Sequence, residues 1–236
     1  MKHASQNTIT QNIKTIQSQI RVLEQKYGRP TNSVQLLAVS KTRPIEDIYA
    51  AFAENQLFFG ENYLQDALSK IGVFTDSAVK WHFIGPIQSN KTRQIAENFH
   101  WVHTLDRLKI AQRLSDQRAA IKEPLNVCIQ VNVSGEESKS GVSPEEALSL
   151  AKQVSKLPNI KLRGLMTIPA SSENLELEQQ RKPFQILREL KEQIQSQGIE
   201  LDTLSMGMSN DMEAAIAEGS TIVRIGTAIF GARNSV

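Results

Sequence analysis

The sequence of 236 residues lacks the features that mark secreted and membrane proteins. It contains one cysteine, Cys128, so no disulfide can form within the chain, and a reducing compartment is expected. No segment approaches the roughly 20 consecutive apolar residues that span a membrane. The first eight residues, Met-Lys-His-Ala-Ser-Gln-Asn-Thr, contain no apolar run of the signal-peptide kind. We therefore expect a cytoplasmic protein that does not insert into a membrane.

The chain also has little net charge. Its 27 lysines and arginines nearly balance its 25 aspartates and glutamates, which leaves a net charge of +2. A nucleic-acid-binding protein usually carries a strongly basic surface, so nucleic acid is not an expected partner. No stretch rich in Pro, Gly and Ser divides the chain, and there is no internal repeat. At this length, with 40% hydrophobic residues, we expect one domain over residues 1–236.

Short apolar runs alternate with helical patterns along the whole chain. Residues 9–27 carry apolar side chains at steps of three and four, which predicts an amphipathic helix that Gly28 and Pro30 terminate. Eight strands are then expected at about residues 36–40, 57–60, 81–84, 101–104, 126–132, 161–167, 201–205 and 222–226. Cys128 falls in the fifth of these runs, which indicates an inert core thiol.

The helices between the strands carry start and stop signals. Pro44 is expected at a first helical position, Ser143 to Glu146 form a capping box, and Gly198 is expected to end a later helix. No Gly-x-Gly-x-x-Gly follows the first strand, which argues against an open doubly wound sheet. The pattern predicts an α/β protein with a (β/α)₈ TIM barrel and an extra N-terminal helix.

A barrel of this kind places its chemistry at the C-terminal ends of its strands. Lys41 follows the first strand there, and a partly desolvated lysine amine can form an imine with an aldehyde. A lysine at such a position is more often a solvated loop residue. Arg224 lies inside the last apolar strand, where an unpaired charge is expensive. It is expected either to reach a salt bridge on the barrel rim or to face the ring nitrogen of a cofactor, which it would hold unprotonated.

The loops after the seventh and eighth strands contain a candidate phosphate site. Ser209 is expected to cap a helix that Gly219 ends, and a helix start is also an anion site. Gly226 and Thr227 would add N–H groups and a hydroxyl at the position where barrels commonly bind phosphate. An amine, a phosphate cup and a partner for a ring nitrogen are together what pyridoxal 5′-phosphate (PLP) needs. The segment 134–141, with Lys139, is either a lid or a plain solvated loop.

Several motifs, in order along nearly the whole chain, resemble the pyridoxal phosphate homeostasis protein family. The motifs are Leu37-Ala-Val-Ser-Lys-Thr42, Phe59-Gly-Glu-Asn-Tyr63, His82-Phe-Ile-Gly-Pro-Ile-Gln-Ser-Asn-Lys91, Ser138-Lys-Ser-Gly141, Gly164-Leu-Met166, Met206-Gly-Met-Ser-Asn-Asp-Met212 and Arg224-Ile-Gly-Thr-Ala-Ile-Phe-Gly231.

The resemblance implies a barrel like the N-terminal domain of alanine racemase, with PLP held as a Schiff base on Lys41. It also implies Arg224 at the pyridine nitrogen and phosphate contacts at Ser209, Gly226 and Thr227. Three further positions match family residues that line the cofactor: Asn62, His82 and Met206. Arg43 stands where many members carry a second lysine, which leaves the roles of Arg43 and Lys139 in cofactor transfer open.

The same resemblance implies a non-catalytic role in vitamin B6 homeostasis. Racemase chemistry needs a second base opposite the lysine, from an appended β domain, and this chain ends just after its eighth strand. We therefore expect no catalytic residue and no metal, and a monomer that carries PLP, with apo-PLP enzymes as candidate recipients. One alternative is a racemase or lyase with Tyr63 or His82 as the second base. Another is a PLP-free aldolase, which the absence of a lysine in Gly164-Leu-Met-Thr-Ile168 argues against.

Overall fold

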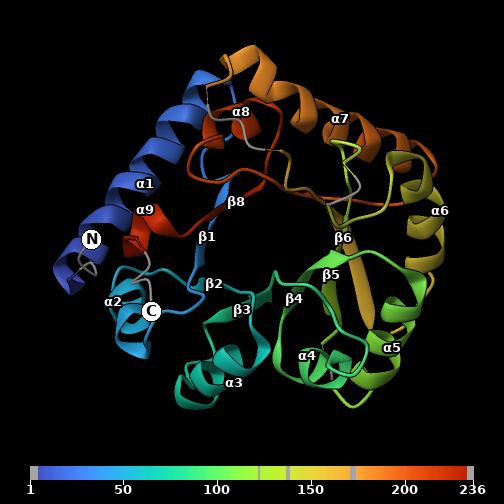
Figure 1. The fold of residues 1–236 in the computed structure, drawn as a ribbon, viewed down its shortest axis with the longest axis horizontal. Coiled ribbons are helices and arrows are strands. Elements are labelled where there is room, and N and C mark those ends of the chain that lie inside the picture. Colours follow the sequence, from blue (N-terminus) through green and yellow to red (C-terminus); the bar gives the residue numbers. More distant parts are fainter. Residues whose placement is uncertain (1–4, 122, 137–138, 171–173, 233–236) are drawn as a thin grey trace.

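The computed structural model describes residues 5–121, 123–136, 139–170 and 174–232. Eight parallel strands form a closed barrel in sequential order, so that β8 returns to pair with β1. Helices surround this barrel (Figure 1). The strands are β1 (Gln35–Val39), β2 (Phe58–Glu61), β3 (Lys80–Phe83), β4 (Trp101–Leu105), β5 (Leu125–Gln130), β6 (Ile160–Met166), β7 (Thr203–Ser205) and β8 (Ile222–Ile225). The predicted (β/α)₈ barrel is confirmed, and each strand begins and ends within two residues of its expected bounds.

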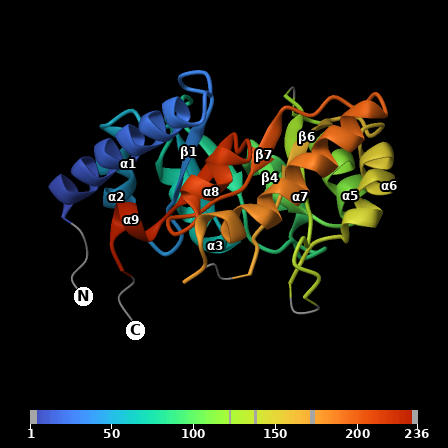
Figure 2. The same ribbon diagram turned by 90° about the horizontal axis from the view of Figure 1, so that it is seen from above.

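The helices follow the order expected from the sequence. They are α1 (Gln6–Lys26), α2 (Ile45–Phe52), α3 (Leu64–Val73), α4 (Thr92–Asn98), α5 (Leu108–Arg118), α6 (Pro144–Val154), α7 (Leu177–Ser196), α8 (Met212–Ala217) and α9 (Thr227–Phe230). The N-terminal helix α1 buries its isoleucine stripe, with Ile9, Ile13 and Ile20 fully inaccessible. It lies beside α9 from the other end of the chain (Figure 2). The Asn12 amide donates to the Ile229 carbonyl at 2.8 Å, which joins the two helices directly.

Two of the predicted helix starts are wrong, and one is confirmed. Pro44 is not a helical residue: its ψ of 162° is extended, and it precedes α2 as the N-cap. Ser209 does not cap α8, because that helix begins at Met212 with Asp211 as its N-cap. Ser143 forms the predicted capping box with Glu146, with a proline at the first helical position. Gly198 ends α7 as expected, with a φ of 80°.

The strand pairing fixes which side chains face the barrel interior. Leu37 lies opposite Arg224, and Gly60 lies opposite His82. Because side chains alternate along a strand, residues two apart in β1 share the inward face up to the mouth. A Cβ on Gly60 would lie 3.0 Å from the Ile84 side chain and 3.2 Å from that of Leu37, which shows how closely this interior is packed.

Cys128 lies on β5 and is fully inaccessible. Burial away from water raises the pKa of its thiol to about 12, because the thiolate would be poorly solvated there. The predicted core position of this thiol is therefore confirmed.

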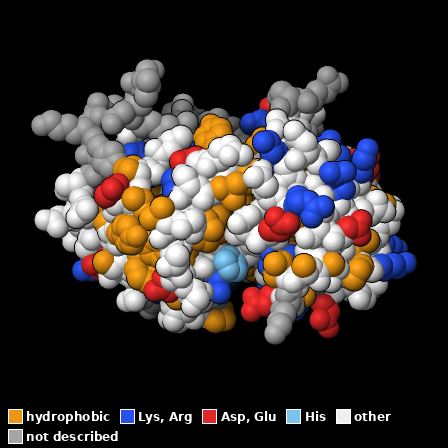
Figure 3. All heavy atoms as spheres, turned by 90° about the horizontal axis from the view of Figure 1, so that it is seen from below, with side chains coloured by type: hydrophobic (Ala, Val, Ile, Leu, Met, Phe, Trp, Pro, Cys, Tyr) orange, Lys and Arg blue, Asp and Glu red, His pale blue; other side chains and the backbone are white. Residues whose placement is uncertain are grey.

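Hydrophobic side chains gather over α2 and α3 on the face seen in Figure 3. Tyr49 and Val73 are the large hydrophobic residues of these two helices that are exposed. The Phe74 ring lies 4.9 Å from the ring of Tyr49 and 5.1 Å from that of Phe52, centroid to centroid, so aromatic contacts fasten α2 to the end of α3. Among the described helices, none is long and apolar enough to cross a membrane.

Candidate functional site

A cavity of about 450 Å³ opens at the C-terminal ends of the strands. The C-terminal ends of β1, β6 and β8 form part of its wall. The segments that follow β1, β2, β3, β6, β7 and β8 form the rest. Six of the eight predicted cofactor-binding residues line it: Lys41, Asn62, Ser209, Arg224, Gly226 and Thr227. Val39, Ile84 and Met166 add apolar surface. The barrel thus brings together residues from opposite ends of the sequence.

Lys41 reaches this wall because of the alternation along β1. Leu37 and Val39 face inward, and Lys41 lies two residues further on, in the turn after the strand. The next residue, Thr42, has a φ of 61°, which a threonine rarely adopts, so the turn must be held by its surroundings. The Thr42 N–H donates to Asp66 Oδ2 at 3.0 Å.

A buried ion cluster lies beneath this turn. The Lys70 amine donates to Glu61 Oε1 at 2.9 Å, to Asp66 Oδ2 at 2.8 Å and to the Ser40 carbonyl at 2.9 Å. The Ser40 hydroxyl also donates to Glu61 Oε1, at 2.6 Å. Burial raises the pKa of the Glu61 carboxyl, and the charge of Lys70 opposes that rise. The cluster therefore fixes the residues on both sides of Lys41, and sequence reasoning did not find it.

Arg224 combines deep burial with access to the cavity. Its side chain donates from Nη1 to the Ser205 hydroxyl and from Nη2 to the Thr167 carbonyl, both at 2.9 Å. It forms no ion pair with any carboxylate in the described part of the chain, so the salt-bridge alternative is excluded there. Burial lowers the pKa of the guanidinium to about 10, and Asp211 opposes this shift. The group is still charged at neutral pH, and its remaining N–H groups are donors for a ligand.

The loops after β7 and β8 form the polar end of the cavity. Ser209 is exposed, and its hydroxyl makes no hydrogen bond to a described residue, so it is open to a ligand. Asp211 closes its own loop instead, since Oδ1 accepts from the Met208 N–H at 2.6 Å. Gly226 allows the backbone after β8 to lie close to β1, because a Cβ at this position would be only 3.3 Å from the Val39 carbonyl oxygen. These loops offer hydroxyls and backbone N–H groups for an anion, without a long helix behind them.

Two predicted residues, His82 and Met206, do not line the cavity. His82 is fully buried within β3, below the mouth, and Ile84 takes the wall position two residues later. The His82 ring stacks on Trp101 with centroids 5.3 Å apart and an interplanar angle of 3°. Met206, the first residue after β7, is fully buried and packs in the hydrophobic core.

Arg43 and Lys139 are also absent from the cavity wall. Arg43 is buried and donates to the Gly231 carbonyl, so it ties the Lys41 loop to the segment after α9. Lys139 belongs to the loop 134–141, of which residues 137–138 lie outside the described part. The Lys139 N–H donates to the Glu136 carbonyl at 3.0 Å. The side-chain amide of Asn132 donates to the same carbonyl at 2.8 Å, which holds this loop to the end of β5.

The chemistry of the cavity fits PLP. It combines a primary amine, a guanidinium with donors to spare, and a hydroxyl-rich end that suits a phosphate. The Asn62 amide oxygen is buried on this wall and has no hydrogen-bond partner among the described residues, so this amide is available to a ligand. The residues that the structure describes contain no cluster of His, Cys, Asp and Glu that could hold a metal ion.

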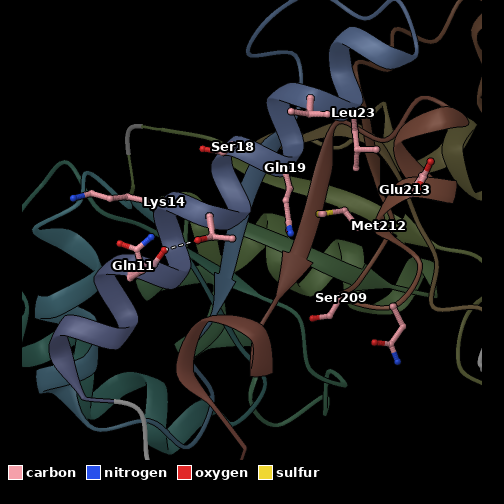
Figure 4. A pocket seen from close by; sticks show the side chains of 11 residues that line it. Gln11, Lys14, Ser18, Gln19, Leu23, Ser209, Met212 and Glu213 are labelled. Carbon is pink, nitrogen blue, oxygen red and sulfur yellow. Dashed lines mark hydrogen bonds between the residues drawn. The ribbon is translucent and has the colours of Figure 1, made fainter.

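A larger groove of about 720 Å³ lies next to this cavity, between α1 and the loop before α8 (Figure 4). Gln19 and Leu23 of α1 line it together with Met212 and Glu213, and Ser209 borders both hollows. The carboxylate of Glu213 is already paired, because it accepts from the amine of Lys26 at 2.6 Å and from the hydroxyl of Tyr27 at 2.9 Å. One carboxylate oxygen of Glu213 in this groove is therefore already engaged within the protein.

Comparison with known proteins gives consistent matches over nearly the whole chain. The family model of the alanine racemase N-terminal domain matches residues 11–234. A pyridoxal phosphate homeostasis protein of Vibrio alginolyticus is 58% identical over 232 residues, which cover 97% of this chain and 99% of that one. The PLP-bound structure of PipY from Synechococcus elongatus PCC7942 has a TM-score of 0.82 at 34% identity, over 94% of this chain and 100% of PipY. An alanine racemase of Clostridium difficile has a TM-score of 0.77 at 15% identity, over 97% of this chain and 60% of the racemase, and shows the fold alone.

Proposed function

Because the chain belongs to the alanine racemase N-terminal domain family and, within it, to the pyridoxal phosphate homeostasis proteins, we propose that it binds PLP at the barrel mouth and acts in intracellular PLP homeostasis. The observation that carries this proposal is the convergence of Lys41, Arg224 and the Ser209 loop on one cavity of suitable size. The PLP-bound relative PipY, which shares the fold over its full length, supports the choice of ligand.

Each wall residue has a distinct task in this proposal. The Lys41 amine would hold PLP as a Schiff base, because the PLP aldehyde supplies an electrophilic carbon that condenses with a primary amine and releases water. Ser209, Gly226 and Thr227 bind the phosphate through hydroxyls and backbone N–H groups. The guanidinium of Arg224 donates to the ring nitrogen and keeps it unprotonated, because arginine retains its own proton. The Asn62 amide, in the loop after β2, would make a further polar contact with the ligand.

A carrier or regulator role is favoured over a racemase by the composition of the wall. The two candidates for a second base, Tyr63 and His82, are both absent from it. The titratable side chains on the described wall are Lys41, Asp211 and Arg224. Asp211 already accepts from the Met208 N–H, and Arg224 disfavours the protonated ring on which electron withdrawal depends. The proposal therefore assigns no catalytic residue, and apo-PLP enzymes are the proposed recipients of the cofactor.

The carrier proposal predicts transfer of PLP without turnover. The PLP-loaded protein should activate an apo-PLP enzyme at least as fast as the same total concentration of free PLP. It should not wash deuterium into the α-carbon of alanine or other small amino acids faster than free PLP does. Activation slower than with free PLP would contradict the carrier role, and rapid deuterium exchange would favour the racemase alternative.

The phosphate contacts are tested by Ser209→Ala and Thr227→Val. Each change removes one hydroxyl but leaves the backbone N–H groups, so PLP affinity should fall by about tenfold to a hundredfold, the value of one charge-assisted hydrogen bond of about 1.5–3 kcal/mol. Equilibrium titration with PLP measures the loss. Ser18→Ala is the matched control, because Ser18 is exposed and lines only the neighbouring groove. Unchanged affinity in both test variants would place the phosphate elsewhere.

A further inference from the structure

A continuous chain of buried polar side chains crosses the barrel interior below the cavity. His82 Nδ1 lies 2.8 Å from His103 Nε2, and His103 Nδ1 lies 2.8 Å from the Ser205 hydroxyl oxygen. Arg224 donates to that same oxygen at 2.9 Å. Each of these residues is at most 4% exposed, and only Arg224 reaches the cavity wall. The chain therefore connects the wall to the middle of the barrel.

The chemistry of these groups fixes the direction in which the chain donates. A guanidinium can only donate, so the Ser205 oxygen accepts from Arg224, and its proton is left for His103 Nδ1. An imidazole that accepts at Nδ1 carries its proton on Nε2, so His103 donates to His82 Nδ1. In this direction only His82 Nε2, beside Trp101, has no partner among the described residues. The opposite direction would leave the Ser205 proton unpaired as well, at a further cost.

Both imidazoles of the chain are neutral. Burial, and next the charge of Arg224, lower the pKa of His103 to about 3. Burial also lowers the pKa of His82 well below its usual value. A protonated His103 would have to donate to the Ser205 oxygen from Nδ1, which would leave the Ser205 proton without an acceptor. A neutral His103 can instead accept that proton at Nδ1.

We infer that His103 and Ser205 are positioning residues, which set the orientation of the Arg224 guanidinium at the cavity and thereby its hydrogen bond to the ring nitrogen of PLP. The Thr167 carbonyl is the second anchor, so the plane of the guanidinium is fixed at two of its nitrogens. His82 completes the chain by accepting from His103, and does not itself line the cavity. This inference rests on the proposed function.

The direction of the chain is measured on the protein without PLP, so this result does not depend on PLP binding. Long-range ¹⁵N–¹H spectra of histidine-labelled protein distinguish the two neutral tautomers. At neutral pH we expect the Nε2–H tautomer for both His82 and His103. Ser205→Ala should give His103 a mixture of tautomers, because Nδ1 loses its donor, while Ser205→Thr should keep the parent tautomer. An Nδ1–H tautomer of His103 in the parent protein would overturn the inference.

The effect on the ligand is measured with PLP labelled with ¹⁵N at the ring. Ser205→Ala should lower PLP affinity by about tenfold and move the ring ¹⁵N shift, and Ser205→Thr should restore both. Ser115→Ala is the matched control, since Ser115 is also buried but donates to the Pro158 carbonyl. It should reduce stability without changing either readout.

These experiments distinguish a failure of the proposed function from a failure of the positioning role. A parent protein that did not bind PLP would overturn the proposed function. A parent that bound PLP, with Ser205→Ala indistinguishable from Ser115→Ala in affinity and ring ¹⁵N shift, would overturn the positioning role alone.

Discussion

Lys41→Ala should abolish covalent retention of PLP while the barrel remains folded. In the parent protein, borohydride reduction should fix PLP to Lys41, because this is the amine on the cavity wall among the described residues. In the variant, reduction should leave no PLP on the protein at stoichiometric concentrations, and its visible imine absorption should be missing. Thermal unfolding should change little, because a half-buried side chain at the barrel rim contributes little to the core.

Lys91→Ala is the control for this experiment. Lys91 precedes α4 in the loop after β3 and does not line the cavity. The control variant should therefore retain PLP as the parent does. Peptide mapping that found the reduced PLP mainly on Lys91 or Lys139 would refute the assignment of the amine.

Lys70→Met should produce the largest loss of stability. Removing one partner of a buried ion pair leaves an uncompensated charge, which typically costs about 3–5 kcal/mol. Here Glu61 is fully inaccessible, and one of its carboxylate oxygens already has no partner among the described residues. Urea denaturation measures the loss. PLP affinity should also fall, because the Ser40 carbonyl and Asp66 would no longer be held under the Lys41 turn.

Lys26→Met is the matched control for Lys70→Met. Lys26 also pairs with a glutamate, at 2.6 Å from Glu213, but its side chain is exposed on the outside of α1. Removing it should cause no comparable loss, because solvent already screens that pair. Equal losses of unfolding free energy in the two variants would show that the buried cluster stabilises the fold no more than an exposed ion pair does.

The loss of unfolding free energy caused by Lys70→Met should become smaller as pH falls. The folded-state pKa of Glu61 is raised above its ordinary value, so the folded protein binds this proton more tightly than the unfolded chain does. Its contribution to stability therefore falls as pH rises from the ordinary carboxyl pKa through the raised one. Without Lys70 the pKa of Glu61 should rise further, because the amine opposes that rise in the parent. The difference between parent and variant should then shrink as pH falls, and a difference that grew toward acid would contradict the role of Glu61.

Much of the fold could be predicted because hydrophobic periodicity and strand order are local properties of the sequence. The alternation of short apolar runs with helical patterns leads to a barrel, and a barrel brings strand ends to one mouth. This logic placed Lys41, Arg224 and the Ser209 loop near one another without any contact information. The depth of a single side chain in the barrel is harder to predict. His82 is buried and absent from the cavity wall, where Ile84, two residues on, lies instead, so its contact with the cofactor stays a prediction.

The remaining site features depend on contacts that no local pattern encodes. Lys70 looks like one more lysine on an amphipathic helix, and only the closed barrel places it under Ser40. Ser205 and His103 are 102 residues apart and meet because β4 and β7 face each other across the interior. Ser209 resembled a helix cap because serine commonly occupies that position, but Asp211 takes it in the structure.

The buried thiol of Cys128 makes transient opening of the barrel measurable. It is the only cysteine of the chain, and it is fully inaccessible on β5. A thiol-specific reagent can therefore modify the intact protein only when β5 is exposed, and the modification rate at high reagent concentration counts such events. A ligand that binds only the closed barrel should slow this rate as the occupied fraction of the protein rises. The modification rate of Cys128 thus measures both the opening of the barrel and the fraction of the protein that has ligand bound, and no further cysteine has to be introduced.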